Sequence, residues 1–347
     1  SNVEQGIDDT ESSGEAFRFR LTASPRKGRW HDVGIFYLGE EFDMTDMGYQ
    51  MKNDWIFAGT QNGLKLTDFK DSSIFLSNEF ELGFGFEGNA DLDKSTTFTY
   101  LNFKSTFKNT SFMEFGNFHK AASKDFWITR GNKDADFIKK PENYGTSLQY
   151  KGPSKNFFNY FLEIKREKGQ QWGFSALGFS TSYTAKIDLA LKDNLKFSLM
   201  HQHSDEDNWL NWEKDNLLSL YENKKQRTTV ASLNWFGGDR HELRMKAQMV
   251  AFTARNPSAY LGDSSGSLNS FDLDLPPLTL GDLAFQVRYR YEILPLAYLY
   301  VVYSKGGRIV AYDEEDGLGE IYKRPWNDPQ ADTCLLYTSD AADDLGR

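Results

Sequence analysis

Hydrophobic and polar residues alternate with a period of two along most of the chain. Between Leu283 and Ile293 the odd positions are apolar or aromatic, whereas the even positions carry Arg288, Arg290 and Glu292. Successive side chains of a β-strand point to opposite faces, so this alternation predicts a strand with one apolar and one charged face. Similar stretches recur roughly 15 times along the chain, which predicts an all-β protein.

The connections between these strands are expected to alternate between short turns and longer polar segments. Short turns are expected near Asn109 and at 152–156, 192–194, 237–239 and 294–296. Longer connections are expected at 119–144, 204–227, 254–280 and 305–333, with the shorter 167–171 link in the same set. This order predicts up-and-down strands with all turns at one end and all long loops at the other, as in outer-membrane barrels.

The predicted fold is an antiparallel up-and-down transmembrane β-barrel, with about 15 strands visible of roughly 16 and an incomplete C-terminus. Many strands reach about ten residues, as a tilted membrane crossing requires, and aromatic residues lie near strand ends. A soluble β-sandwich or propeller is the alternative, with its apolar faces turned inward. In the barrel interpretation, the aromatic face meets lipid and the charged face lines the lumen.

Two stretches are less regular. Residues 207–226 are expected to hold a short helix within an external loop, and residues 256–278 are rich in turn-forming residues and are expected to be irregular. No composition break divides the chain, so a single barrel domain is expected over residues 16–333, preceded by a flexible segment or linker remnant at 1–15.

The end of the chain is expected to be foreign to the protein. The string CLLYTSDAADD, which begins at Cys334, matches a sequencing adapter in translation. Residues 334–347 are therefore interpreted as a non-native tail, and the native sequence is expected to end near Thr333. The remaining residues contain no cysteine, which fits an envelope protein and excludes thiol chemistry.

Charge and hydropathy narrow the class further. The formal net charge is −10, so no nucleic-acid partner is expected. The longest apolar stretch, residues 294–302, is about nine residues long, whereas a membrane-spanning helix needs roughly 20.

The charged faces supply the candidate functional residues. In a wide barrel such side chains tune selectivity, whereas in a narrow or plugged barrel they form an interior network of ion pairs. The predicted lumen-lining residues are Arg18, Arg20, Arg244, Lys246, Arg288, Arg290 and Glu292.

Signals for other chemistry are weak. His201 and His203 project to one side of a strand and are weak candidates for a metal site, but they share their parity with apolar positions, so an interfacial pair is the competing interpretation. Acidic turns at 263–267 and 313–317 are weak calcium candidates. No spacing ties a nucleophile or carboxylate pair to a histidine, so neither catalytic residues nor a cofactor are predicted.

Three segments resemble a known family. They are FYLGEEFDMTDMGYQMKNDW (36–55), LNWFGGDRHELRMKAQMVAFTAR (233–255) and LAFQVRYRYEILPLAYLYVVYSKGG (283–307). The chain resembles the C-terminal β-barrel domain, of uncharacterised function, of bacterial outer-membrane proteins that carry an N-terminal module similar to family 9 carbohydrate-binding modules. That module and the closing strand of the barrel are expected to be missing here, which would leave two unpaired edges.

The resemblance implies a bacterial outer-membrane location, contacts with lipid and the outer-membrane assembly machinery, and a carbohydrate ligand. The first functional hypothesis is passage or uptake of a polar, saccharide-derived solute, coupled to the missing module. The alternatives are a membrane anchor that displays a glycan-binding module and loops, and a barrel hydrolase.

Overall fold

A computed structural model describes most of the chain. The described residues are 14–42, 54–90, 92, 95–125, 128, 137–155, 157–169, 178–312 and 317–339.

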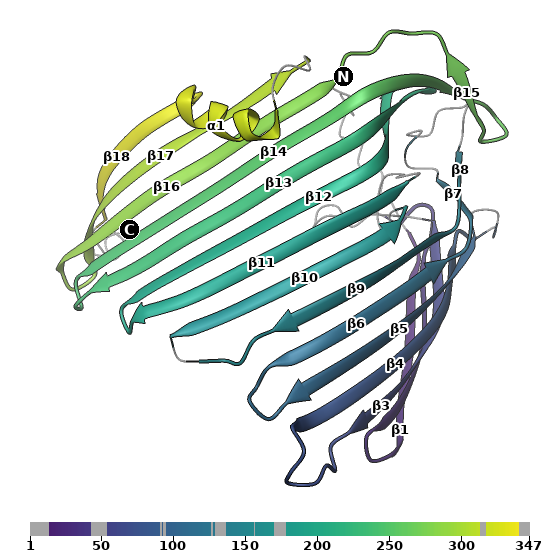
Figure 1. Cartoon of the computed structure of the whole chain (residues 1–347), viewed down its shortest axis with the longest axis horizontal. Helices are drawn as coiled ribbons and strands as arrows, with labels where there is room; N and C mark the ends of the chain where they lie inside the picture. The colour runs from purple at the N-terminus through teal and green to yellow at the C-terminus, as the bar shows by residue number, and fades with distance from the viewer. Residues whose placement is uncertain are drawn as a thin grey trace.

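These residues form 18 strands and one helix (Figure 1). The strands of the first half are β1 (Ala16–Arg26), β2 (Arg29–Leu38), β3 (Trp55–Leu66), β4 (Phe75–Gly88), β5 (Thr96–Phe107), β6 (Phe112–Lys120), β7 (Ser123–Asp125), β8 (Ile138–Lys140) and β9 (Asn143–Lys151). The remaining elements are β10 (Phe158–Lys168), β11 (Phe179–Lys192), β12 (Leu195–Lys214), β13 (Leu217–Gly237), β14 (His241–Gly262), β15 (Leu268–Phe271), β16 (Leu278–Leu294), β17 (Ala297–Ala311), α1 (Leu318–Asn327) and β18 (Ala331–Ser339).

The strands build one strongly curved antiparallel sheet of 16 strands, in which nearly every strand pairs with its neighbours in sequence. The path runs β1 to β6, β9 to β14, then β16, β17 and β18; β15 adds to β14, and β7 and β8 form a separate pair. Figure 1 shows the tilted strands side by side along this path. No pairing within the described part of the chain joins β18 to β1. The architecture confirms the predicted all-β, up-and-down barrel fold.

The register shows which positions share a face. Directly paired residues point to the same side of a sheet, and one unbroken row of pairs crosses β2 to β17. Its members are Trp30, Gly63, Glu81, Asn102, Gly116, Ser147, Lys165, Ser182, Ser204, Gln226, Phe252, Leu280 and Val310. We call this side the inner face and the opposite side the outer face.

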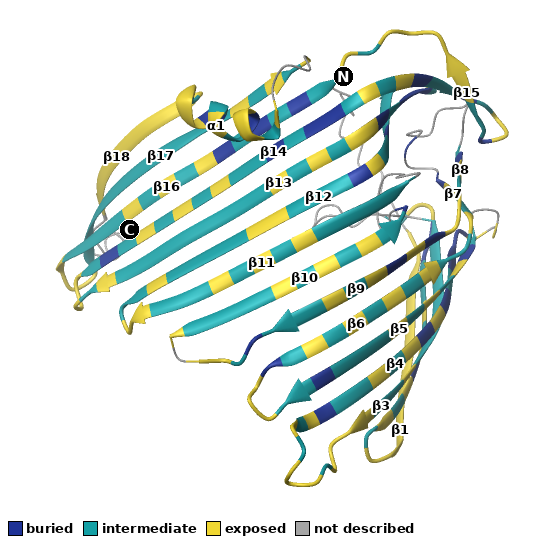
Figure 2. Cartoon of the chain, in the orientation of Figure 1, coloured by how far each residue is buried: buried dark blue, intermediate teal, exposed yellow. Residues whose placement is uncertain are grey.

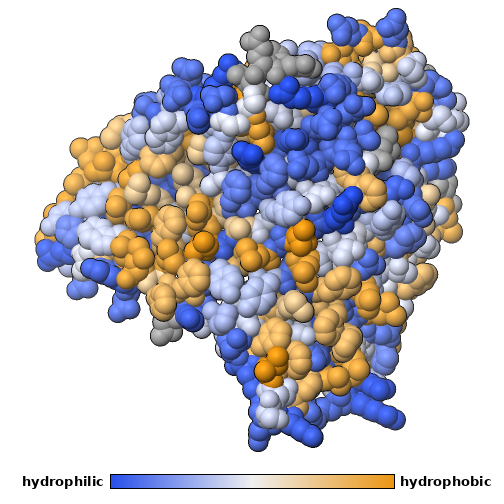
Figure 3. Space-filling model, viewed as in Figure 1, coloured by the Kyte–Doolittle hydropathy of each residue, from blue (hydrophilic) through white to orange (hydrophobic). Residues whose placement is uncertain are grey.

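The outer face carries exposed apolar side chains. Phe19 is 47% exposed, Phe84 53% and Leu162 50%. Exposed and partly covered positions alternate along β10 in Figure 2, with Leu162 and Ile164 of the outer face exposed, whereas along β16 the exposed positions Ala284, Gln286 and Arg288 lie on the inner face. Figure 3 shows hydrophobic side chains gathered over the lower part of the molecule and hydrophilic ones at its upper right. Water-exposed apolar residues in a continuous belt are typical of a surface that meets lipid.

The five predicted short turns are confirmed, because each falls between two paired strands: β5–β6, β9–β10, β11–β12, β13–β14 and β16–β17. The long connection at 119–144 is also present and holds the β7–β8 pair. Turns and long connections therefore lie at opposite ends of the strands.

The predicted loop at 204–227, with its short helix, is wrong. β12 and β13 continue through it as strands of 20 and 21 residues, joined by Asp215 and Asn216, with Asp215 in the left-handed region at φ 46°. Asp tolerates that conformation better than most residues do. The polar composition suggested a loop, but the strands extend because their ends pack against other loop segments.

A buried apolar cluster of the described residues lies at this loop end, where β12 and β13 extend toward their connecting turn. Leu210 and Leu218 from the extended hairpin are fully buried against Ile128 and Ile138 from the 119–144 connection. Trp212, Leu220 and Leu268 pack around them. We call the four buried residues the loop-end core, and it explains why the polar hairpin is ordered.

The two last connections also differ from expectation. β14 continues to Gly262 and pairs with β15, so residues 256–278 are irregular only in part. The 305–333 segment contains α1, which lies on the outer face: a β-carbon added to Gly281 would approach the Ile321 carbonyl oxygen to 2.7 Å. Figure 1 shows α1 in front of β14 and β16.

No helix in the described ranges is long and apolar enough to cross a membrane.

A further strand, β18, pairs with β17 from Tyr298↔Ser339 to Gly306↔Ala331, and β1 and β18 are the two edges of the sheet among the described residues. β18 includes six residues of the expected non-native tail, Cys334–Ser339. An exposed strand edge offers backbone N–H and C=O groups that any extended segment can satisfy. Pairing therefore depends little on side chains, and the foreign origin of the tail stays a prediction.

Candidate binding surfaces on the inner face

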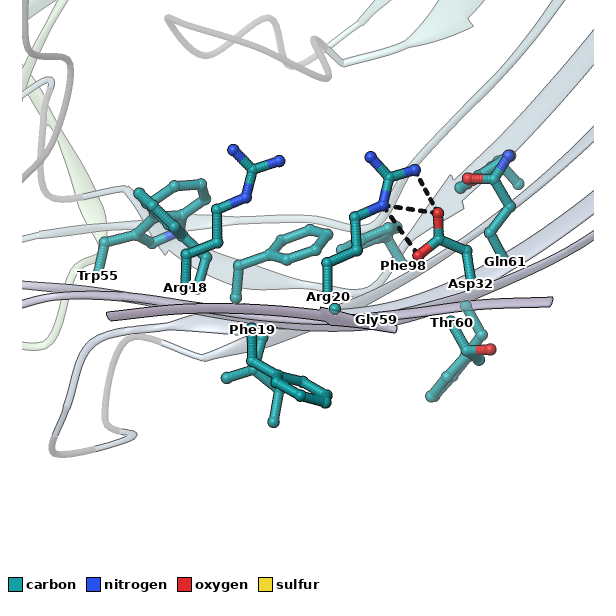
Figure 4. A pocket seen from close by; sticks show the side chains of 15 residues that line it. Arg18, Phe19, Arg20, Asp32, Trp55, Gly59, Thr60, Gln61 and Phe98 are labelled. Atoms are coloured by element: carbon teal, nitrogen blue, oxygen red, sulfur yellow. Dashed lines mark hydrogen bonds and ion pairs between the residues drawn. The ribbon is translucent and has the colours of Figure 1, made fainter. Parts of the chain in front are cut away.

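Arg18 and Arg20, two of the predicted lumen-lining residues, lie on the inner face of β1. Figure 4 shows both side chains on one side of the sheet and Phe19 on the other. Arg20 Nε lies 2.8 Å from Asp32 Oδ2 and 3.0 Å from Oδ1, and Arg20 Nη2 also contacts Oδ2. The Asp32 carboxylate is nearly buried, with 11% of its side chain exposed. The ion pair therefore fixes the Arg20 side chain against the wall.

A pocket of about 360 Å³ lies beside these two arginines. Its inner-face aromatic lining comes from β2, β3 and β5, whereas Phe19, Ile35, Thr60 and Phe84 of the same lining lie on the outer face. The rings of Phe57 and Phe98 stack at a centroid distance of 5.6 Å and an angle of 27°, and the Trp55 ring meets Phe36 edge-on at 5.3 Å. Figure 4 shows Trp55 and Phe98 on the same side of the sheet as the arginines.

Two glycines that line this pocket, Gly34 and Gly59, flatten its floor, and a third glycine, Gly85, lies beside them under the Phe98 ring. Gly34, Gly59 and Gly85 pair directly with one another across β2, β3 and β4, in the same row as Arg20 and Phe98. The Phe98 ring lies over Gly85, where an added β-carbon would meet the ring at 2.3 Å. Aromatic rings on inner positions thus lie down on glycines of the neighbouring strand.

These inner aromatic residues were missed at the sequence level. The aromatic face was expected to meet lipid throughout, but Trp55, Phe57, Phe98 and Tyr100 have the inner parity of their strands. A usable signal was present, because on β3 the residues Trp55 and Phe57 share a parity with Gly59. An apolar position in line with glycines marks a ring that covers them, not one that faces lipid.

A second surface brings together three other predicted residues. Arg244 pairs directly with Arg288, and Arg290 pairs with Glu242. Arg290 Nη2 lies 2.9 Å from Glu242 Oε2, and Arg244 Nε donates to Glu242 Oε1. Only 7% of the Glu242 side chain is exposed, so one nearly buried carboxylate holds two arginines. The sequence did not single out Glu242.

Tyrosines of β17 complete this arginine cluster. The Arg288 guanidinium lies 4.9 Å from the Tyr300 ring centroid, and that of Arg290 lies 4.9 Å from the Tyr298 ring. These are cation–π distances. Lys246 pairs with Ser232 and Gln286 on the same face, and Glu292 lies opposite Tyr298 at the turn end. Arg18 and Arg20 belong to the other surface.

Replacing Glu242 by Gln is expected to destabilise the fold by about 1–3 kcal/mol. Removing one partner of a buried ion pair costs roughly 3–5 kcal/mol, and this cost is reduced here because Arg244 and Arg290 are 58% and 36% exposed. Chemical unfolding in lipid vesicles measures the change. The double variant Glu242→Gln/Arg290→Gln should recover part of the loss, and an unchanged stability of Glu242→Gln would contradict the assignment.

The two weak metal candidates lie on the outer face. His201 Nδ1 lies 2.7 Å from Thr229 Oγ1, and His203 Nε2 lies 3.2 Å from Asp205 Oδ2. In the part of the chain that the structure describes, no group of three or more His, Cys, Asp or Glu residues lies close enough to hold a metal ion. Their position agrees with the interfacial interpretation.

The turn at 263–267 shows how its carboxylate is used. Asp263 Oδ1 accepts hydrogen bonds from the backbone N–H groups of Ser265 and Ser267, at 2.8 and 3.0 Å, and Asp263 Oδ2 accepts one from Asn269 Nδ2 at 2.9 Å. The Ser265 hydroxyl, followed by the Ser267 backbone N–H and the Asn269 amide, holds the pKa of Asp263 well below its usual range. The other calcium candidate, 313–317, lies almost wholly outside the described residues.

The sheet topology, the outer apolar belt and the charged inner face define the class: a β-barrel of the outer-membrane type. The chain belongs to the family described as domain of unknown function DUF5916, whose model matches residues 1–330. The siderophore receptor PirA from Acinetobacter baumannii is similar in structure, with 11% sequence identity and a TM-score of 0.37. The match covers 94% of this chain and 63% of the receptor chain, so this chain spans less than two thirds of it. No curated protein matches the sequence.

Proposed function

We propose that the protein lies in the bacterial outer membrane and gives passage to a polar solute of the saccharide type. The observation that carries this proposal is the opposite character of the two faces of one sheet. The outer face exposes phenylalanine and leucine side chains, as a lipid contact requires. The inner face carries arginine, lysine and carboxylate groups in hydrogen-bonded pairs, as a water-filled lumen favours.

The inner polar groups continue from strand to strand. Gln149 Nε2 donates to Glu163 Oε1 at 2.8 Å, and Lys104 Nζ lies 3.4 Å from Glu114 Oε2. On the inner face of β16 and β17, near the other edge of the sheet, Arg308 Nη2 lies 2.7 Å from Asp282 Oδ2. A solute that moves along this wall would meet paired charges and amides throughout, which suits a hydroxylated molecule better than an apolar one.

Single-channel conductance in a planar lipid bilayer tests this proposal. The full-length protein is expected to give discrete current steps. Changing Arg244, Arg288 and Arg290 to Gln together should shift the ion selectivity toward cations, because three positive charges leave the wall. Lys27→Gln is the matched control and should leave the selectivity unchanged. Lys27 lies in the β1–β2 turn, is exposed, and forms an ion pair with Asp68.

A folded, inserted but silent protein would overturn the proposed passage and favour a membrane anchor that displays a glycan-binding module and loops. An anchor predicts ligand binding that survives removal of the barrel. A barrel hydrolase instead predicts activity that disappears with a single loop histidine or aspartate. Conductance steps whose ion selectivity is unchanged when the three arginines are replaced would contradict the place of these arginines on the lumen wall.

A further inference from the structure

We infer that the pocket on the inner face of β1 to β5 binds an acidic saccharide, with a sugar ring on the aromatic floor and a carboxylate on Arg18. This inference rests on the proposed function, because it names the solute class for the same lumen. It goes further by assigning a site, a charge and separate roles to the residues of that site.

The shape of the floor favours a sugar ring. A pyranose offers a flat face of C–H groups and a polar edge of hydroxyl groups. The flat face matches the stacked Phe57 and Phe98 rings and the glycine floor beside them, where an added β-carbon on Gly34 would find nothing nearer than the Phe19 carbonyl oxygen, at 3.7 Å. The whole pocket, including its part beside Phe19 and Phe84 of the outer face, measures about 360 Å³, at the lower end of the range for small-ligand sites.

The rim of the floor can hydrogen-bond the hydroxyl edge. Asp32 and Gln61 pair directly across β2 and β3, and Figure 4 shows both side chains rising from the sheet on the side of the rings. Asp32 accepts hydrogen bonds, while the Gln61 amide both donates and accepts. Apolar rings with a few fixed polar groups at their edge are the usual composition of a site for an amphipathic small molecule.

The charge of the pocket selects an anion. Arg20 is neutralised by Asp32, whereas Arg18 makes no ion pair with any described residue. Figure 4 shows the Arg18 guanidinium on the same side as the rings. Two guanidinium groups therefore face one carboxylate among the lining residues. A guanidinium binds a carboxylate through two parallel hydrogen bonds, so a uronate fits better than a neutral sugar.

Direct binding tests the inference without any use of conductance. The full-length protein in lipid nanodiscs is titrated with trigalacturonate and, separately, with its neutral trimethyl ester, by isothermal calorimetry. We expect the acid to bind at least tenfold more tightly than the ester. Arg18→Gln should bring the two ligands to about equal affinity, and Arg18→Lys should restore only part of the preference because lysine lacks the planar fork.

A second variant keeps the test independent of charge. Gly34→Leu places a side chain on the floor at a position where an added β-carbon makes only an ordinary contact, with the Phe19 carbonyl oxygen at 3.7 Å, so the strand should fold and the pocket should be filled. We expect binding of acid and ester to be lost together. Ala284→Leu adds the same side chain to the inner face of β16, outside the pocket, and should bind as the native protein does.

Three results would overturn the inference: no binding of either ligand to the native protein, equal affinity for acid and ester, or full binding by Gly34→Leu. Gel mobility before and after heating shows whether each variant is folded. A protein that conducts but does not bind would refute the site and leave the passage function intact. A protein that binds the acid but does not conduct would support the site and refute the passage function.

Discussion

Met245→Arg is expected to destabilise the barrel in a lipid bilayer by about 2–4 kcal/mol, the cost of a cationic side chain near the bilayer midplane. Met245 lies on the outer face of β14, directly between Leu233 on β13 and Val287 on β16. An arginine there would leave its charge among acyl chains. Unfolding with denaturant in lipid vesicles, followed by tryptophan fluorescence, measures the loss.

The matched control is Gln248→Arg on the same strand. Gln248 has the opposite parity and lies on the inner face between Val230 and Ala284, where an arginine joins other charges in water. We expect its effect to stay within about 0.5 kcal/mol. Equal effects of the two variants, or a larger effect at Gln248, would show that the assignment of the faces is reversed.

Leu218→Ala is expected to cost about 2–5 kcal/mol, as for other fully buried leucines. Leu218 is 0% exposed in the loop-end core, beside Leu210, Ile128 and Ile138. Because this core lies at the loop end of the β12–β13 hairpin, the loss should appear as local opening. Hydrogen exchange is expected to quicken in the β12–β13 hairpin near Asp215. The half of β13 next to the β13–β14 turn should stay protected.

Leu273→Ala provides the comparison for this region. Leu273 is 42% exposed, between β15 and β16, so its truncation removes little buried surface and should change exchange rates only slightly. Global unfolding of the barrel by Leu218→Ala would contradict a separate loop-end core. So would exchange rates that are unchanged throughout the hairpin.

The strands were predictable because their signal is local. Between Leu283 and Ile293 of β16 the period of two is unbroken, and each short turn carries glycine, proline, aspartate or asparagine at the change of direction. The division of the side chains into two faces followed from the same alternation, and so did the shared face of Arg18, Arg244 and Arg288. None of these features needs knowledge of a distant contact.

The mistakes arose where distant contacts decide the structure. The segment 204–227 has the composition of a loop, and only its packing against Ile128 and Ile138 makes it a hairpin. The helix at 318–327 is stabilised by the outer face of β16. Glu242 went unnoticed because its role depends on the register that sets it opposite Arg290.

The sequence by itself determined the two-faced strands, the order of turns and long connections, and the parity of the charged residues, because side-chain direction alternates along any strand. Only the tertiary structure decided which charges meet, that Trp55 and Phe98 turn inward over glycines, and that the buried apolar cluster lies at the loop end. Those outcomes depend on register and on sheet curvature, which join residues far apart in sequence and leave no local trace in any one strand.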